Sequence, residues 1–290
     1  MSVSVYPGPN VGLLDENGNP YGVKQVDGKP RVSSVPYLYD IAEGVIANHS
    51  SFRVLGYTID IDNVERDIWE YGSIASARYV FPTVAMGLEL VSTSDEDSGA
   101  GGVNPAGTGI QTVEIHYLDN TWAEQVEVIA LDGTTAVTTL AVNIYRINGF
   151  HTKTTGISKM AVGAIQLRHL ADTPVYSYIS VGRNHALQAV YTVPLGKVAY
   201  IVGWNYSSGA VAIGHYARFI LLATVNDEVW QDGVFNIKDI VLIQDGNGAH
   251  DFQSPIKLPA KTDMKVGVIS DGAASNVLVS AQISGWIESV

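Results

Sequence analysis

The sequence predicts an all-β protein, with two antiparallel β-sandwich domains of jelly-roll-like type preceded by an extended N-terminal arm. Apolar and polar residues alternate with a period of two through most of the chain, as in QTVEIHYL at 111–118, and this is the period of a β-strand. Most of these segments are bounded by Gly, Pro, Asn or Asp, which is typical of sandwiches and barrels. A length of 290 residues also reaches the usual ceiling for a single hydrophobic core.

The expected arm covers residues 1–45 and is rich in turn signals. Asn17-Gly18 and Asp27-Gly28 are tight-turn pairs, and the few valines around them cannot build a core. Two interpretations remain open: a frayed terminus without a role, or an arm that becomes ordered against a neighbouring subunit. A short helix capped by Asp40 is expected within 39–49.

We expect the first sandwich at 46–185 and the second at 186–290. Alternating segments such as SFRVLGYTIDI and EQVEVIAL belong to the first, and KVAYIVGW, DMKVGVIS and NVLVSAQISGWI belong to the second. Between them, LADTPVYSYISVGRNH interrupts the pattern. The stretch STSDEDSGAGGVNPAGTG at 92–109 has almost no apolar content, so a solvated loop is expected there.

The charge and composition of the chain indicate which partners and which location in the cell to expect. The net charge is -12 and no basic cluster is present, so no nucleic-acid partner is expected. No apolar run approaches the roughly 18 residues of a membrane span, and the N-terminus lacks a signal-peptide pattern, so we expect a soluble protein made in the cytoplasm. Only 16% of residues are charged, against about 25% on average, which favours a surface partly covered by other subunits.

No catalytic, cofactor-binding or metal-ligating residue is predicted. The chain has no cysteine, no G-x-S-x-G motif, and no phosphate-loop Lys after its Gly-rich stretch. The acidic residues Asp95, Glu96 and Asp97 fall in the expected loop. None of the seven histidines has the i, i+4 spacing of a zinc helix, and each is expected at a surface or interface; they are His49, His116, His151, His169, His185, His215 and His250.

Two clusters of acidic and amide residues are candidate calcium sites, because hard cations need only oxygen ligands. They are Asp60, Asp62, Glu65 and Asp67 in the first, and Asp245, Asn247 and Asp251 in the second. The second departs from a calcium loop at its fifth, sixth and twelfth positions, and solvated turns are the favoured interpretation of both. The five tryptophans could stack on sugars, but core or interface packing is favoured, notably for Trp204 and Trp286 in alternating strands.

Three stretches resemble segments of structural proteins of tailed bacteriophage virions. They are ALQAVYTVPLGKVAYIVGWN at 186–205, QTVEIHYLDNTWAEQVEVIALDGTTAV at 111–137, and DENGNPYGV followed by DGKPRVSS near the N-terminus. The resemblance implies a homo-oligomeric, non-enzymatic virion component on the head exterior as a decoration protein, at a vertex, or in the head-to-tail region. Its expected partners are other virion proteins and copies of itself, and it supplies no functional residues. The alternative is a receptor- or glycan-binding module at the particle surface.

Overall fold

A computed structural model describes residues 23–26, 29–32, 37–59, 61–75, 78–209, 216–226, 234–271 and 277–290. The chain divides into two compact units, Met1–Ile46 and Ala47–Val290. No helix among these described residues is long and apolar enough to cross a membrane.

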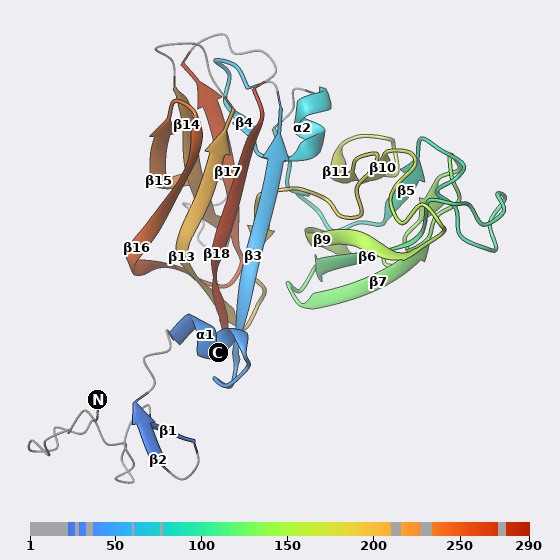
Figure 1. Cartoon of the computed structure of the whole chain (residues 1–290). Helices are drawn as coiled ribbons and strands as arrows, with labels where there is room; N and C mark the ends of the chain where they lie inside the picture. The colour runs from blue at the N-terminus through green and yellow to red at the C-terminus, as the bar shows by residue number, and fades with distance from the viewer. Residues whose placement is uncertain are drawn as a thin grey trace, which may run out of the picture. The chain divides into compact units, whose positions relative to one another are not determined.

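The described residues of the first unit form a hairpin and a short helix (Figure 1). Strand β1 (Val23–Val26) pairs antiparallel with β2 (Lys29–Val32), and helix α1 spans Tyr37–Ala42. Asp40 lies in the first turn of α1, so the expected role of Asp40 as the cap is wrong. Most of the predicted arm, including both turn pairs, lies outside the described residues.

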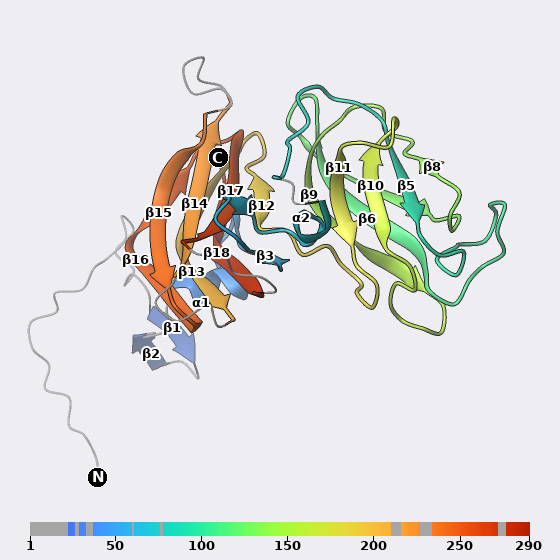
Figure 2. The same ribbon diagram turned by 90° about the horizontal axis from the view of Figure 1, so that it is seen from above.

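Eight strands of the second unit form a double-sheet jelly roll (Figures 1 and 2). One sheet has the order β16-β13-β18-β3 and the other has β12-β17-β14-β15, with every pair antiparallel. Along the chain these strands exchange sheets in the order of two Greek keys, which defines a jelly roll. The strands are β3 (His49–Thr58), β12 (Val190–Thr192), β13 (Lys197–Ser208), β14 (Ala217–Val225), β15 (Asn236–Ile243), β16 (Gly246–Leu258), β17 (Thr262–Ser270) and β18 (Val279–Ser289).

Alternate residues of the two facing sheets fill the interior of the jelly roll. Trp204, Phe219, Val266 and Ile283 belong to one apolar cluster, and each is at most 1% exposed. Because side chains of a strand alternate between faces, the period-two pattern of these segments places their apolar residues inside. The described interior is therefore a packed core.

Strands that lie between β3 and β12 in the sequence form a separate sandwich, with sheets of order β11-β10-β5-β8 and β7-β6-β9. The strands are β5 (Leu88–Ser92), β6 (Ile110–Asp119), β7 (Glu124–Ala130), β8 (Val137–Thr138), β9 (Ile144–Thr155), β10 (Ile165–His169) and β11 (Val175–Ile179). Val113, Ile115 and Tyr117 of β6 are buried in its core, as their alternation predicts. The all-β, antiparallel fold class is thus confirmed.

The strand β3 does not lie where the sequence places it. Residues 49–58 were expected in the first sandwich, but β3 pairs with β18, from His49 opposite Glu288 to Thr58 opposite Val279. The two-residue strand β4 (Arg66–Asp67) likewise pairs with β17, and helix α2 (Glu70–Ala75) follows it. The sandwich of β5 to β11 is therefore inserted between the first two strands of the jelly roll, and no local pattern reveals a pairing across so long a separation.

Candidate functional site

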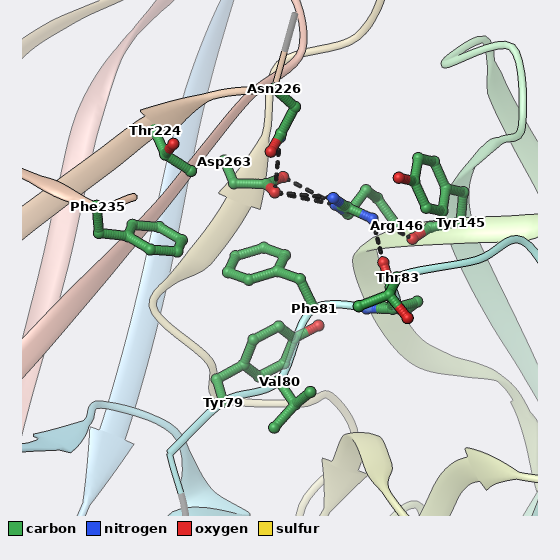
Figure 3. A pocket seen from close by; sticks show the side chains of 11 residues that line it. Tyr79, Val80, Phe81, Thr83, Tyr145, Arg146, Thr224, Asn226, Phe235 and Asp263 are labelled. Carbon is green, nitrogen blue, oxygen red and sulfur yellow. Dashed lines mark hydrogen bonds and ion pairs between the residues drawn. The ribbon is translucent and has the colours of Figure 1, made fainter. Parts of the chain in front are cut away.

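A pocket of ≈ 410 Å³ lies where the segment Tyr79–Thr83 and the start of β9 meet the jelly roll (Figure 3). Strand β9 contributes Tyr145 and Arg146. Its other lining residues come from the jelly roll and are Thr224, Asn226, Phe235 and Asp263. Residues of both sandwiches therefore build one hollow.

Arg146 and Asp263 form a buried ion pair in this pocket, with side chains 5% and 3% exposed. The Nε of Arg146 lies 2.9 and 3.1 Å from the two Asp263 carboxylate oxygens, and Nη2 lies 3.0 Å from one of them. Asp263 also accepts hydrogen bonds from Thr192 at 2.5 Å and Asn226 at 2.8 Å. The Nη1 of Arg146 donates to the carbonyl oxygen of Pro82 at 2.6 Å. Because both charges are fully engaged, the pair acts as a clamp between the two sandwiches.

Aromatic rings surround this clamp. The guanidinium carbon of Arg146 lies 4.1 Å from the Tyr145 ring centroid, 5.0 Å from that of Trp122 and 5.4 Å from that of Phe81. Phe81 also stacks on Phe235 across the pocket. The hydroxyl of Tyr79 is buried without a hydrogen-bond partner, and burial raises its pKa. Among these lining residues no nucleophile is paired with a base.

The acidic residues of the first calcium candidate pair with separate Arg and Lys side chains. Asp62 pairs with Arg66 at 2.5 Å, and this hydrogen bond lowers the pKa of the Asp62 carboxyl. Asp67 is buried against Lys265 at 2.9 Å, and burial raises the pKa of Asp67 despite the nearby ammonium. Glu65 lies 3.8 Å from Arg78, and Asp60 falls outside the described residues.

The second calcium candidate lies along an extended strand. Asn247 and Asp251 both belong to β16, and their backbones pair opposite Ser207 and Gly203 of β13. They are four positions apart along the strand, which places them about 13 Å apart. Asn247 and Asp251 therefore do not surround a common point.

The acidic stretch 92–109 differs from the expected solvated loop, since Asp97 is completely buried. Its carboxylate accepts hydrogen bonds from the Ser92 hydroxyl at 2.7 Å and from three backbone amides at 2.7 to 3.0 Å; the amides are those of Ile110, Val162 and Gly163. Asp95 accepts from the Thr134 hydroxyl at 2.6 Å, which lowers its pKa. These carboxylates accept hydrogen bonds from backbone amides and hydroxyl groups and so fix the conformation of the loop. The composition of the stretch does not predict these hydrogen bonds.

Histidines that are scattered in sequence meet on one sheet. His116 and His151 stack with ring centroids 5.1 Å apart, and Glu114 contacts both. This cluster was not predicted, because no histidine has the i, i+4 spacing of a zinc helix and none was expected beside a second ligand. The i, i+2 spacing of Glu114 and His116 on a strand does predict that these two side chains share a face. The approach of His151 depends on the register between β9 and β6.

Tryptophan placement also differs in one case. Trp204 lies in the jelly-roll core as expected. Trp286 does not, because it is half-buried and stacks on Tyr200 with centroids 4.9 Å apart and planes 14° apart. Trp230 lies outside the described residues.

The outer face of β15 is apolar and exposed. Ile237, Ile240 and Leu242 are 58%, 42% and 63% exposed, and they stand opposite Leu222, Ile220 and Arg218 of β14. We call these three residues the β15 face. Within the described part of the chain, β15 is the last strand of its sheet, so its other backbone edge is unpaired there.

No protein-family model and no curated protein sequence matches this chain. Its structure is weakly similar to viral particle proteins. A structure of the Gt strain of infectious bursal disease virus is 8% identical, with a TM-score of 0.22, and the match covers 87% of this chain and 76% of that chain. The VP2 subviral particle of that virus is 9% identical, with a TM-score of 0.20 and coverages of 87% and 77%. Similarities this distant carry no argument about function.

Proposed function

We propose that this chain is a non-enzymatic structural component of a virion, held in place by contacts with copies of itself and with other virion proteins. The β15 face is the observation that carries the proposal. Double-sheet jelly rolls occur in viral capsid proteins, lectins and cupins, and the fold alone does not decide among them. The packed interior leaves the outer surfaces as the places for function.

The β15 face has the properties of an assembly contact. Three large aliphatic side chains stand in water on one edge strand, and burying each against a partner stabilises the contact by about 1.5–3 kcal/mol at most. The unpaired edge can also accept a strand from a neighbour. The low charge content of the chain agrees with a surface that other subunits cover.

The resemblance of residues 111–137 and 186–205 to tailed-bacteriophage proteins supports a more specific proposal for the position in the particle. We place the chain on the head exterior, at a vertex or in the head-to-tail region, after synthesis in the host cytoplasm. The buried ionisable side chains of the pocket support the non-enzymatic part of the proposal, because Arg146 and Asp263 are engaged with each other.

Incorporation into particles tests the proposal. Mass spectrometry of purified virions should detect the chain at a fixed stoichiometry. In a complementation experiment, Leu242→Asp should lower its occupancy at least tenfold, because it places a charge in the contact. Leu170→Asp is the matched control, since Leu170 is 52% exposed and lies away from β15. Absence of the chain from particles, or equal occupancy of both variants, would contradict the proposal.

A receptor- or glycan-binding module is the second candidate. The half-buried stack of Trp286 on Tyr200 favours it, because aromatic faces presented on a sheet can pack against sugar rings. Glycan-array binding by the purified chain that disappears in Trp286→Ala, with an unchanged circular dichroism spectrum, would support this candidate. Glycan binding that is unchanged in Trp286→Ala would show that the stack of Trp286 on Tyr200 is not the glycan site.

A further inference from the structure

One face of the three-stranded sheet gathers two imidazoles and a carboxylate. Glu114 and His116 are two residues apart on β6, so their side chains share a face, and His151 of β9 pairs directly opposite Glu114. The Oε1 of Glu114 lies 2.9 Å from Nε2 of His116 and 3.3 Å from Nε2 of His151. All three potential ligand atoms lie within 4.8 Å of one another.

These distances match the edges of a metal coordination shell. Bonds of about 2.0–2.1 Å in tetrahedral geometry place neighbouring ligand atoms about 3.3 Å apart. Two imidazole nitrogens with one carboxylate oxygen are a ligand set suited to zinc and similar divalent transition metals. A hard cation such as calcium would instead require mostly oxygen ligands.

Neighbouring groups prepare the ligand atoms. The Nζ of Lys153 lies 2.5 Å from Oε2 of Glu114, which leaves Oε1 turned toward the two histidines, as a supporting contact around a metal site does. The Lys153 ammonium also repels a cation, so the affinity should be lower than that of a site without it.

We propose that Glu114, His116 and His151 bind one divalent transition-metal ion of the zinc type, with one coordination position left open. The His116 and His151 side chains are 44% and 39% exposed, so the open position faces solvent. It can take water or a side chain of a bound partner. This site lies on a sheet separate from the β15 face, so it stands independently of the proposed function.

Cobalt binding tests the site on the full-length chain. After treatment with chelator, the protein is titrated with Co²⁺, whose visible absorption reports its coordination, and with Zn²⁺ in competition. We expect one Co²⁺ per chain, displaced by Zn²⁺, and at least a hundredfold weaker binding in His116→Ala and in His151→Ala. His169→Ala is the matched control, because His169 ends β10, is not part of the cluster, and its ring accepts a hydrogen bond from the amide of Ala171; this variant should bind as the wild type does.

Glu114→Gln separates a metal site from simple hydrogen bonding. The substitution keeps the shape of the side chain but removes its charge, so Co²⁺ binding should weaken at least tenfold while the circular dichroism spectrum is unchanged. Failure of the wild-type chain to bind Co²⁺ or Zn²⁺ at micromolar concentrations would overturn the proposal. Equal binding by the wild type and the two histidine variants would also overturn it.

Discussion

Removing Asp263 should loosen the jelly roll from the inserted sandwich. Asp263→Ala deletes three contacts to Arg146 and the acceptor for Thr192 and Asn226. The Arg146 guanidinium would then stay buried, with the carbonyl oxygens of Pro82 and Tyr145 as its remaining hydrogen-bond acceptors. Breaking one side of a buried ion pair costs about 3–5 kcal/mol of unfolding free energy.

Urea unfolding followed by tryptophan fluorescence and circular dichroism measures this loss. With an m-value near 3 kcal/mol/M, the expected loss lowers the urea midpoint by about 1–1.7 M. Arg146→Met/Asp263→Leu removes both charges, so it should be more stable than the sum of its single substitutions predicts, by more than about 1 kcal/mol. A double variant that is strictly additive would refute the clamp.

The chain offers a matched control for this experiment. Lys197 of β13 and Glu124 of β7 also form an ion pair between the two sandwiches, but their side chains are 27% and 48% exposed. Exposed pairs contribute about 0–1 kcal/mol. Lys197→Met should therefore shift the urea midpoint far less than Asp263→Ala, and equal shifts would mean that burial of the clamp is not what makes it strong.

Three further predictions concern the acidic loop, the carboxylate of β6 and the N-terminal arm. Asp97→Asn should lower the free energy of unfolding in urea by about 2–4 kcal/mol and expose residues 99–107 to protease, because the amide group cannot accept all the hydrogen bonds that Asp97 accepts. Asp95→Asn, at an exposed site, should have a smaller effect on both measurements. The Lys153 ammonium lowers the pKa of Glu114 from 4.5 to about 2. The contribution of the Glu114 carboxylate to stability is therefore complete above pH 4.5 and is lost as the pH falls toward 2. Between pH 7 and pH 2, the melting temperature of Glu114→Gln should fall less than that of the wild type. Deleting residues 1–36 should leave the melting temperature nearly unchanged but prevent incorporation into particles, and normal occupancy of the truncated chain would identify the arm as a frayed end.

Strand alternation predicted the local structure well because burial on one face imposes it directly. The same alternation also predicts where Trp286 lies, because Trp286 is on the same face of its strand as Ser280, Gln282 and Ser284. The opposite face of the strand holds Val279, Ala281 and Ile283, which are buried. The expectation of core packing for Trp286 relied on residue type, whereas the register of the strand decides which face it occupies.

Contacts between distant segments could not be predicted in this way. The pairing of β3 with β18 leaves no trace in the sequence of either strand, since both show the same alternation as strands of the inserted sandwich. The engagement of Asp97 by amides from two segments, Ile110 and residues 162–163, depends on loop geometry. The meeting of His151 with Glu114 depends on the register between β6 and β9, although the shared face of Glu114 and His116 was readable.

The buried charges have a common role that bears on function. Arg146 with Asp263 and Lys265 with Asp67 each join segments that are far apart in the sequence, and Asp97 joins the acidic loop to residues 162–163. Such contacts restrict motion within the second unit, so a partner that binds it has less internal freedom to remove. The outer faces meanwhile present aliphatic side chains on β15 and the imidazole cluster on β6 and β9. A rigid body with interaction chemistry on its outside would suit the fixed place in an assembly that we propose.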